Sequence, residues 1–544
     1  MKRRPTRKSP NGGAAPTNGH AALVRELWQA AVNLRGAIEP ADYKRYVLPI
    51  IFLRFLSLRY EQRREELRRL VSDPQSDYYR LPQVVEDQDE HRAAGAFVVP
   101  EKARWDHIRK SAQADDIKVI LDDALELLEK TYPDKLRGLL PRIYAGSNLA
   151  RENVTGLINL FSKDVFAQDH GGLDLVGLVY EYFIGEFANS EGKRGGEYFT
   201  PKSIVRTLVA MLEPQAGDVF DPCCGSGGMF VQSDVFAGHR RRLSFHGQES
   251  KDFTYRLCRM NLFIHGIDGD IELGNSYFDD KHAALKADYV LANPPFNDGA
   301  KGEDGWGADR VPDKDTRLVL GTERMPLSSR NANTMWILHF LNHLKEGGTA
   351  GFVMATGELS NKETARHAVR KALIEQGYVD AIVQLTGQLF ANTQIPCSLW
   401  FLSRNRGGQN GFRKRTAEIL FIDGRKLGTL IPGSRKQKEL SDEEIQRIAS
   451  VYRTYKRERA PGEVPGFCRA APLEEVRRHD YALTPGRYVG SANGDEDDEP
   501  FEEKFPRLLK QLEVQFAQAG VLEEEIKKQL GALSPADTAR ITKR

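Results

Sequence analysis

The motif Asn293-Pro294-Pro295-Phe296 carries groups that could act on a planar amino group. The apolar residues just before it, 287–291, predict a buried strand of a parallel sheet, which the two prolines end in a rigid turn. The side-chain oxygen of Asn293 and the carbonyl oxygen of Pro294 are two acceptors that can converge on one NH2 group. The ring of Phe296 offers a flat face on which a base could stack. The same residues also fit a turn that only redirects the chain, so their neighbours decide between the two interpretations.

A glycine-rich turn follows a second short predicted strand, 217–221. Asp221 ends this strand, and the turn Gly225-Ser226-Gly227-Gly228 opens a predicted helix. Glycines let backbone N–H groups approach a ligand closely, and a helix N-terminus favours an anionic group. The turn is not G-x-G-x-x-G, and no Gly-Lys-Ser/Thr follows, so both common nucleotide-phosphate sites are disfavoured. A ligand with a carboxylate and an adenosine, but no phosphates, fits this turn better.

A second acid, Glu249, ends the next predicted strand, 243–249. It follows Asp221 by roughly one β-α-β unit, so the two acids should meet at the same edge of a parallel sheet. A carboxylate at that edge can accept hydrogen bonds from ribose hydroxyls. His246, inside the strand, is interpreted as a packed core residue rather than a catalytic one.

A third stretch places a carboxylate and two aromatic rings just before a predicted helix, and it reads Glu197-Tyr198-Phe199-Thr200-Pro201-Lys202. Part of it fits a helix start, because Thr200 or Ser203 could cap the helix and Pro201 suits its first turn. Capping leaves the acid and the two rings unexplained.

The pattern of elements predicts an α/β chain, with a doubly wound sheet between helical regions. Leucines and aromatics at helical spacing in the first third indicate an all-α region, whose helices should be limited by Pro40 and Pro49. The long Gly- and charge-rich segment 298–330 is expected to be functional or disordered. The expected divisions are a disordered basic tail (1–20), an N-terminal helical domain (21–166), a catalytic domain (167–430), a helical and extended region (431–493), and an acidic linker with an amphipathic helix (494–544).

Composition sets limits on function. The 544 residues are too many for one core, and 40% hydrophobic with 28% charged residues is ordinary for a globular protein. A formal charge of +2 is low for a large nucleic-acid enzyme acting alone, so a partner is expected to supply part of any polyanion contact. Five cysteines without a C-x-x-C pair disfavour a disulfide framework and a structural zinc, so no metal is expected. We find no apolar signal segment and no bilayer-spanning run, and we expect a cytoplasmic protein without membrane contact.

These motifs, in this order, resemble a known family. Asp221-Pro222-x-x-Gly225-Ser226-Gly227-Gly228 resembles the cofactor loop of S-adenosylmethionine-dependent DNA methyltransferases, and Asn293-Pro294-Pro295-Phe296 resembles the catalytic motif of their amino-group class. The segment 196–201 is similar to the one that closes over the methionine part of the cofactor. The early helical region and the stretch 481–489 resemble the modification subunit of type I restriction–modification systems. The resemblance covers residues 22 to 531, nearly the whole chain.

The resemblance implies a DNA methyltransferase that acts on the N6 amino group of adenine. Asn293 and the Pro294 carbonyl would draw the amine toward sp3 geometry, and Phe296 would stack on an adenine flipped out of double-stranded DNA. Asp221 and Glu249 would together hold the cofactor, at its amino-acid and ribose ends respectively. After Phe296 the chain lacks an obvious sequence-reading domain, which implies a separate specificity subunit, two copies of this chain per such subunit, and room for a restriction (translocase/nuclease) subunit.

Three alternatives remain at this stage. An N4-cytosine DNA methyltransferase uses the same geometry, although a serine in place of Asn293 is more typical of that class. A glutamine-directed protein N-methyltransferase uses a similar turn, but it would not need the helical region or a C-terminal arm. A catalytically idle DNA-binding scaffold would leave the intact motif at 293–296 without a purpose.

Overall fold

The computed structural model describes two compact units, which comprise Met1–Val489 and Gly490–Arg544. The described residues are 18–36, 38–166, 175–190, 200–240, 242–299, 305–390, 394–409, 411–431, 434, 436–490 and 501–531. Among these residues no helix combines the length and the apolar character needed to cross a membrane. The sequence-based domain limits remain a prediction.

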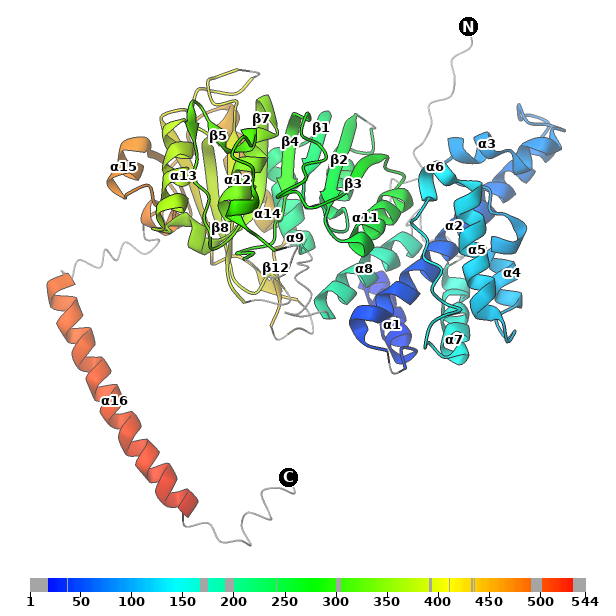
Figure 1. Cartoon of the computed structure of the whole chain (residues 1–544), viewed down its shortest axis with the longest axis horizontal. Coiled ribbons are helices and arrows are strands. Elements are labelled where there is room, and N and C mark those ends of the chain that lie inside the picture. Colours follow the sequence, from blue (N-terminus) through cyan, green and yellow to red (C-terminus); the bar gives the residue numbers. More distant parts are fainter. Residues whose placement is uncertain are drawn as a thin grey trace. The chain divides into compact units, whose positions relative to one another are not determined.

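A nine-stranded sheet forms the centre of the first unit (Figure 1). Its strand order is β13-β10-β8-β9-β7-β4-β1-β2-β3, so the chain continues from β1 to one side and returns with β4 on the other. The pairs β3–β2, β2–β1, β1–β4, β4–β7 and β8–β10 are parallel, whereas β9 and the edge strand β13 run antiparallel to their neighbours. The strands are β1 (Gly217–Asp221), β2 (Leu243–Glu249), β3 (Gly269–Leu273), β4 (Ala287–Ala292), β7 (Leu344–Ala355), β8 (Val379–Leu385), β9 (Cys397–Ser403), β10 (Glu418–Gly424) and β13 (Cys468–Pro472). This arrangement confirms the predicted doubly wound α/β class.

Helices cover both faces of the sheet, because its buried strands carry apolar side chains on both sides. One core joins alternate strand residues to four helices, and a second core on the other face includes Phe220 and two further helices. In Figure 1 α12 and α13 lie in front of the sheet, whereas α9 and α14 lie behind it. The first core contains α9 (Lys202–Leu212), α10 (Gly228–Phe236), α11 (Asp252–Ile264) and α14 (Asp442–Arg457), and the second contains α12 (Asn333–Asn342) and α13 (Thr364–Glu375).

A separate helical core lies beside α11, at the β3 end of the sheet (Figure 1). It confirms the predicted all-α region, and α8 packs into it through Phe183 and Phe187, whose rings contact Trp28. From the sheet side, Phe263 of α11 reaches the same core at Phe52. The helices of this region are α1 (Asn18–Asn33), α2 (Pro40–Ser72), α3 (Gln88–Ala93), α4 (Trp105–Lys110), α5 (Ile117–Thr131), α6 (Pro133–Leu136), α7 (Arg151–Phe161) and α8 (Leu175–Ser190).

Two helix limits in this region differ from the prediction. Pro40 starts α2 as expected, but α2 continues through Pro49, so the expectation that Pro49 limits a helix is wrong. The residues around Pro49 are buried in the helical core, and this packing outweighs the hydrogen bond that the proline removes. α1 already begins at Asn18, inside the predicted tail, while residues 1–17 lie outside the described part.

Three further segments depart from the sequence pattern. β13 adds an unpredicted strand to the sheet, and α15 (Leu473–Arg478) follows it. The described part of 298–330 is packed rather than structureless, with a hairpin of β5 (Val319–Leu320) and β6 (Glu323–Arg324) and a fully buried Trp306. β11 (Thr429–Leu430) and β12 (Lys438–Glu439) form another small hairpin.

The second unit contains α16 (Phe501–Gly531). The sequence predicts an amphipathic helix in this region, and α16 runs through Gly520 without a break. Leu512 and Phe516 lie exposed on α16, with Phe516 68% exposed. The predicted acidic linker, 494–499, and the side chains of Phe505 and Leu508 lie outside the described part.

Candidate active site

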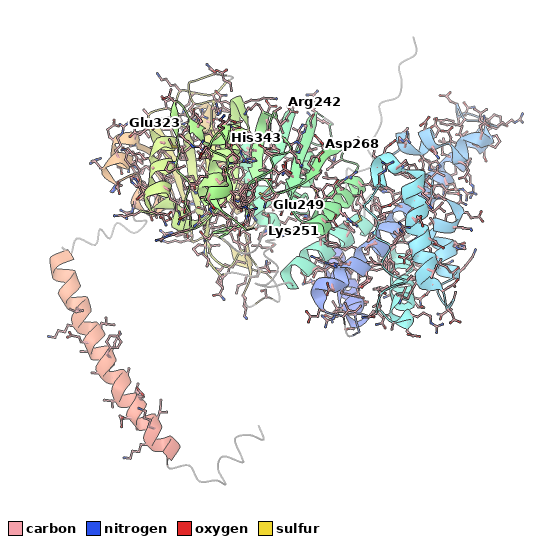
Figure 2. All side chains as sticks on the ribbon, in the orientation of Figure 1. Arg242, Glu249, Lys251, Asp268, Glu323 and His343 are labelled. Atoms are coloured by element: carbon pink, nitrogen blue, oxygen red, sulfur yellow. The ribbon has the colours of Figure 1, made fainter. Side chains whose placement is uncertain are left out.

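A cavity of about 760 Å³ opens at the carboxyl edge of the sheet, beside the point where the strand order reverses between β1 and β4. Parallel sheets place ligands at this position. In Figure 2 Arg242 precedes β2 at one edge of the sheet, and Glu249 ends β2 at the opposite edge. The predicted site residues that line the cavity are Thr200, Lys202, Asp221, Gly225, Ser226, Gly228, Glu249, Asn293 and Pro295. Lys44 and Leu48 of α2 and Glu181 and Ile184 of α8 also line it, so the helical region forms part of the wall.

The glycine-rich turn between β1 and α10 has a backbone that favours glycine. Gly225 and Gly227 have φ values of 53° and 79°, in the left-handed region. A Cβ at Gly227 would lie 2.9 Å from the sulfur of Cys258, so Gly227 serves packing as well as conformation. Gly228 begins α10, lines the cavity, and has no atom within 4 Å of where its Cβ would be. The open space at Gly228 therefore belongs to the cavity.

Asp221 ends β1 and is 2% exposed. One of its carboxylate oxygens accepts a hydrogen bond from the Cys223 N–H at 3.1 Å. Burial, together with a smaller effect of the nearby Glu249 charge, raises the pKa of Asp221 to about 7. A cationic or hydroxyl group of a ligand would supply the stabilising partner that this carboxylate lacks in the described protein.

Glu249 connects the ends of β1 and β2. Its two oxygens accept hydrogen bonds from the N–H of Gly225 at 3.1 Å and of Lys251 at 2.9 Å. Glu249 therefore holds the glycine-rich turn in place, a role that the sequence analysis did not predict. The Ser250 hydroxyl also donates to Glu249, at 3.4 Å, and Glu249 lines the cavity with Lys251 beside it (Figure 2). The structure confirms that Asp221 and Glu249 end neighbouring parallel strands.

Asn293 follows β4 directly and is 9% exposed. Its side-chain nitrogen donates a 2.9 Å hydrogen bond to the hydroxyl of Thr200. Its side-chain oxygen is buried and receives no hydrogen bond from any residue that the structure describes. A buried acceptor without a donor costs roughly 1–3 kcal/mol, so it marks the place where a ligand donor would bind.

The other residues of the motif have different surroundings. Pro295 lines the cavity, whereas Pro294 and Phe296 are not among the lining residues. The ring of Phe296 is half-buried and lies 6.0 Å from the ring of Phe390, edge to face. The Pro294 carbonyl as second acceptor and the Phe296 ring as stacking platform therefore stay predictions.

The turn after the motif is held rigidly in place. Asn297 has a φ of 53°, and its N–H donates to the side-chain oxygen of Asn333 at 3.0 Å. The Asn333 side chain donates in return to Asn297 and to Glu358, at 3.0 and 2.9 Å. Asn333 is fully buried at the start of α12, so this helix fixes where the motif ends.

The third predicted stretch is described only from Thr200 onward. Glu197, Tyr198 and Phe199 lie outside the described residues. The capping prediction is wrong, because Pro201 occupies the N-cap of α9 and its side chain makes no cap hydrogen bond. Thr200 instead accepts the hydrogen bond from Asn293, a contact across 93 residues of chain.

Lys202 pairs with Glu181 of α8 at 3.3 Å, and His265 lies 3.0 Å from the same carboxylate. Burial by itself would raise the pKa of Glu181, but His265 and Lys202 outweigh burial and lower it to about 2. Lys202 thus joins α9 to the helical region at the rim of the cavity. Glu181 belongs to none of the predicted sequence motifs.

Other lining residues also escaped the sequence analysis. Asn261 of α11 donates to the carbonyl of Ser226 at 2.8 Å and so supports the glycine-rich turn. Trp336 donates to the hydroxyl of Tyr277 at 3.0 Å, and this hydroxyl donates to Asp298 at 2.9 Å. The available signals were an asparagine on the buried face of an amphipathic helix and an acid two residues after the motif 293–296.

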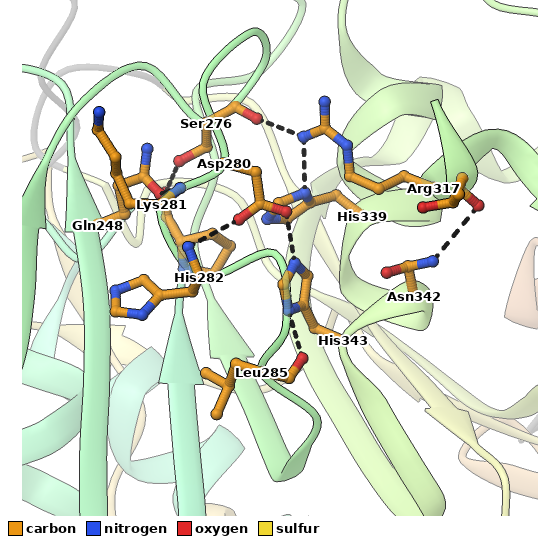
Figure 3. Close-up of polar contacts among 12 residues, drawn as sticks. Gln248, Ser276, Asp280, Lys281, His282, Leu285, Arg317, His339, Asn342 and His343 are labelled. Carbon is orange, nitrogen blue, oxygen red and sulfur yellow. Dashed lines mark hydrogen bonds and ion pairs between the residues drawn. The ribbon is translucent and has the colours of Figure 1, made fainter. Parts of the chain in front are cut away.

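The connection between β3 and β4 carries part of the lining and is anchored by buried polar groups. The Ser276 hydroxyl donates to the Pro222 carbonyl at 2.6 Å. Arg317 donates to the carbonyls of Ser276 and Tyr277 at 2.6 and 2.8 Å, and it also contacts His339 (Figure 3). The 298–330 segment, which contains Arg317, therefore supports the cavity from behind.

These features fit the cofactor that the sequence resemblance implies. Two acids at adjacent strand ends suit the amino group and the ribose hydroxyls of S-adenosylmethionine, and the open cradle at Gly228 has room for a ligand without phosphates. The buried oxygen of Asn293, across the cavity, is suited to accept from an exocyclic amine.

Comparison with known proteins agrees with this geometry. Residues 172–497 match the family model described as N-6 DNA Methylase, and residues 23–162 match the model described as HsdM N-terminal domain. The chain is 38% identical over 525 residues to the type I restriction enzyme MjaIX methylase subunit of Methanocaldococcus jannaschii, covering 93% of this chain and 91% of the relative. It is 38% identical over 461 residues to the HindI methylase subunit of Haemophilus influenzae, covering 80% and 99%. In fold it is similar to a type I restriction–modification methyltransferase subunit from Streptococcus thermophilus, with a TM-score of 0.70 and 23% identity over 87% of this chain and 100% of that one.

Proposed function

Since the chain belongs to the N-6 DNA methylase family, as the methylase subunit of a type I restriction–modification system, we propose that the cavity at the carboxyl edge of β1, β2 and β4 is its methyl-transfer site. The chain is an N6-adenine DNA methyltransferase of a family that depends on S-adenosylmethionine. This assignment takes precedence over the N4-cytosine, protein-glutamine and idle-scaffold alternatives. The observation that carries the placement is the buried, unpartnered oxygen of Asn293 in a cavity that also contains two acids and a glycine cradle.

The residues of β1 and β2 would hold the cofactor. Asp221, which is buried and has no cationic partner within the described ranges, would bind its amino group, and Glu249 would accept from its ribose hydroxyls. Gly225, Ser226, Gly227 and Gly228 would let the backbone approach it, and 197–202 would close over its methionine part. When bound, S-adenosylmethionine supplies a methyl group on a sulfonium, which is a good leaving group.

The residues of the 293–296 motif would prepare the adenine. The N6 amine is a poor nucleophile because its lone pair is delocalised into the ring. The Asn293 oxygen and the Pro294 carbonyl would accept its two N–H groups and favour the sp3 geometry that the transition state requires. Thr200 keeps the Asn293 amide in the orientation that leaves its oxygen toward a ligand. Phe296 would stack on the flipped base.

Replacement of Asn293 tests this placement. With the specificity partner present and its cognate DNA, Asn293→Ala should lower the methyl-transfer rate about 10²- to 10³-fold, the effect of removing one preorganised group at a developing charge. Cofactor affinity, measured by calorimetry, should stay unchanged. Thr200→Val, which removes only the group that orients the amide, should cost less. A near-normal rate in Asn293→Ala would show that Asn293 is a turn residue.

We further propose that the chain joins a specificity subunit through α16, with two copies of the chain per specificity subunit, and that a restriction subunit can join this complex. The near-neutral charge and the exposed Leu512 and Phe516 of α16 support this assembly. Exposed apolar residues at helical spacing are a common means of docking a helix on a partner. The complex would bind double-stranded DNA, and the isolated chain should bind DNA weakly and without sequence preference.

Deletion of residues 500–544 tests the docking surface. Cofactor binding should remain, because the cavity lies in the other unit, whereas co-purification with the specificity subunit should be lost. Phe516→Ser should weaken assembly, and Lys527→Ser, at an exposed polar position of the same helix, should not. Assembly at undiminished yield after the deletion would show that the docking surface lies elsewhere, most plausibly on the N-terminal helices.

A further inference from the structure

Two groups of histidine and aspartate side chains occur away from the catalytic cavity, within the part of the chain that the structure describes. The first consists of His246 of β2, Asp270 of β3 and His282, which lies between β3 and β4. His246 and Asp270 are directly paired in the β2–β3 register, so their side chains share one face of the sheet. One nitrogen or oxygen atom from each of the three residues lies within 4.8 Å of the others.

The contacts of the two histidines place one ring nitrogen of each near the carboxylate of Asp270. His282 Nε2 donates to the carbonyl of Gly247 at 2.9 Å, so its Nδ1 carries the lone pair, 3.8 Å from Asp270. His246 Nε2 lies 3.5 Å from the carboxylate of Asp218, and its Nδ1 lies 3.6 Å from Asp270. The contacts to Asp270 are too long for hydrogen bonds. Histidines that ligate metals are commonly oriented in this way, with the second nitrogen donating to a carbonyl or carboxylate.

The surroundings favour a cation. Asp270 belongs to the group, and the carboxylate of Asp218 lies 3.5 Å from His246. Lys345 pairs with Asp218 and Asp288 at 2.7 Å, so two carboxylates share its one positive charge. The Asp270 side chain is 60% exposed, which leaves a path for an ion and a water molecule, and His282 is buried.

In the second group, most of the histidine ring nitrogens that a metal would need already have partners within the protein. This group contains Asp280, His339 and His343 (Figure 3). His343 uses both ring nitrogens, on the Leu285 carbonyl at 2.9 Å and on Asp280 at 3.0 Å. Arg317 places a guanidinium 3.0 Å from His339 Nδ1. The second group is therefore a closed hydrogen-bond network that already contains its own cation.

We propose that His246, Asp270 and His282 form a binding site for a divalent transition-metal ion of the zinc type, completed by water. Two imidazoles and one carboxylate suit such ions better than magnesium or calcium, which prefer oxygen ligands. Neighbouring ligands of a tetrahedral zinc ion lie about 3.3–3.4 Å apart, given bonds of about 2.0–2.1 Å. The separations of 3.6 and 3.8 Å need to contract by only a few tenths of an ångström. The sequence-based expectation of no metal rested on cysteine spacing, and this site uses no cysteine.

The position of the site gives the ion a structural role. Asn275, Ser276 and Tyr277 line the catalytic cavity and lie along the chain between the two ligands Asp270 and His282. An ion bound to both ligands and to His246 would fasten this connection to β2, which ends in Glu249. The effect of the ion on the catalytic cavity rests on the proposed function. The choice of His246, Asp270 and His282 as ligands does not.

The test is zinc binding to the full chain, with any affinity tag removed and metal stripped by a chelator, followed by calorimetry. Wild type should take up one ion. Asp270→Asn, an exposed change that preserves the fold, and His246→Gln should each weaken binding at least about 10-fold, as loss of groups that merely orient ligands already does. His367→Gln, which breaks an exposed His–Asp pair elsewhere, should bind as wild type does.

Cobalt in place of zinc identifies the ligands, because thiolate ligation gives a charge-transfer absorption band that nitrogen and oxygen ligands do not. We expect a cobalt spectrum without that band, lost in Asp270→Asn. No uptake, equal affinity in wild type and Asp270→Asn, or a thiolate band, which would place the ion at Cys224 and Cys258, would each overturn the proposal. None of these readings depends on methyl transfer, so they are independent of the Asn293 test.

Discussion

Asp221 and Asp380 are both buried aspartates on strands of the same sheet, yet their surroundings are opposite. Asp221 is 2% exposed, lines the cavity and accepts one backbone hydrogen bond. Asp380, on β8, is fully buried and receives both arms of Arg415 at 2.8 and 2.9 Å and the hydroxyl of Tyr452 at 2.8 Å. The Nε atom of Arg406 also lies 3.1 Å from a carboxylate oxygen of Asp380.

The pKa values express this difference. Burial raises the pKa of Asp221 to about 7, because no cation among the described residues compensates the loss of water. Burial alone would raise the pKa of Asp380 as well, but Arg415 and Arg406 outweigh burial and hold it below its ordinary value. A buried acid whose cations come from the chain is part of the fold, whereas a buried acid without a cation is prepared for a ligand that brings one.

The largest effect is expected when the charge of Asp380 is removed. Asp380→Asn would leave Arg415 and Arg406 buried without a counter-charge, which should lower the free energy of unfolding by about 3–5 kcal/mol. Thermal or denaturant unfolding measures this loss. Asp442→Asn, which breaks the exposed ion pair with Arg206, should cost at most about 1 kcal/mol. If Asp380→Asn and Asp442→Asn both lost only about 1 kcal/mol of unfolding free energy, the stability of the Asp380 cluster would not depend on the charge of Asp380.

Asp221→Asn should act mainly on ligand binding. Loss of a charged partner for the cofactor's amino group should weaken S-adenosylmethionine binding by about 1.5–3 kcal/mol, roughly 10- to 150-fold. Asp218→Asn, on the same strand but at the other edge of the sheet, should leave cofactor affinity unchanged. Unchanged affinity in Asp221→Asn, measured by calorimetry, would remove Asp221 from the cofactor site.

The pH dependence of the same variant has a definite sign. The folded-state pKa of about 7 lies above the reference value of 3.8, so between these values the folded protein holds a proton that the unfolded chain has lost. The contribution of Asp221 to stability therefore falls as pH rises from about 4 to 7, and Asp221→Asn should stabilise the free protein at pH 8 but not at pH 4. Cofactor affinity, which needs the ionised acid, should fall below pH 7 in wild type and change less in the variant.

The Asp221 region could be predicted from sequence because its signals are local. Strands of apolar residues bounded by Gly and Pro placed β1, β2 and β4 within a residue or two of their ends. Parallel pairing then required Asp221 and Glu249 to share one edge. The glycine turn and the Asn-Pro-Pro-Phe motif are likewise contiguous in sequence, so each could be recognised without knowledge of the remaining fold.

The remainder depends on contacts between distant parts of the chain. Asp380 resembles any polar residue near the start of a strand, and its partners Arg406, Arg415 and Tyr452 follow far along the chain. The Thr200–Asn293 hydrogen bond spans two motifs that the sequence analysis treated separately. β13 is short and contains alanine and proline, which are weak strand formers, and its pairing with β10 comes from a distant part of the chain.

The smallest effect on stability is expected at the hydrogen bond from the Tyr452 hydroxyl to Asp380. Among the described residues, Tyr452 is the only neutral side chain that donates to this carboxylate. Tyr452→Phe removes the hydroxyl and keeps the ring, which packs 5.0 Å from Phe401. Because Arg415 and Arg406 still compensate the carboxylate, the loss should be about 0.5–1.5 kcal/mol, well below that of Asp380→Asn. The double variant should lose little more free energy of unfolding than Asp380→Asn alone, because the Tyr452 hydroxyl then has no carboxylate to which it can donate. Additive losses in the double variant, measured by the same unfolding experiment, would show that Tyr452 stabilises α14 through its ring and not through Asp380.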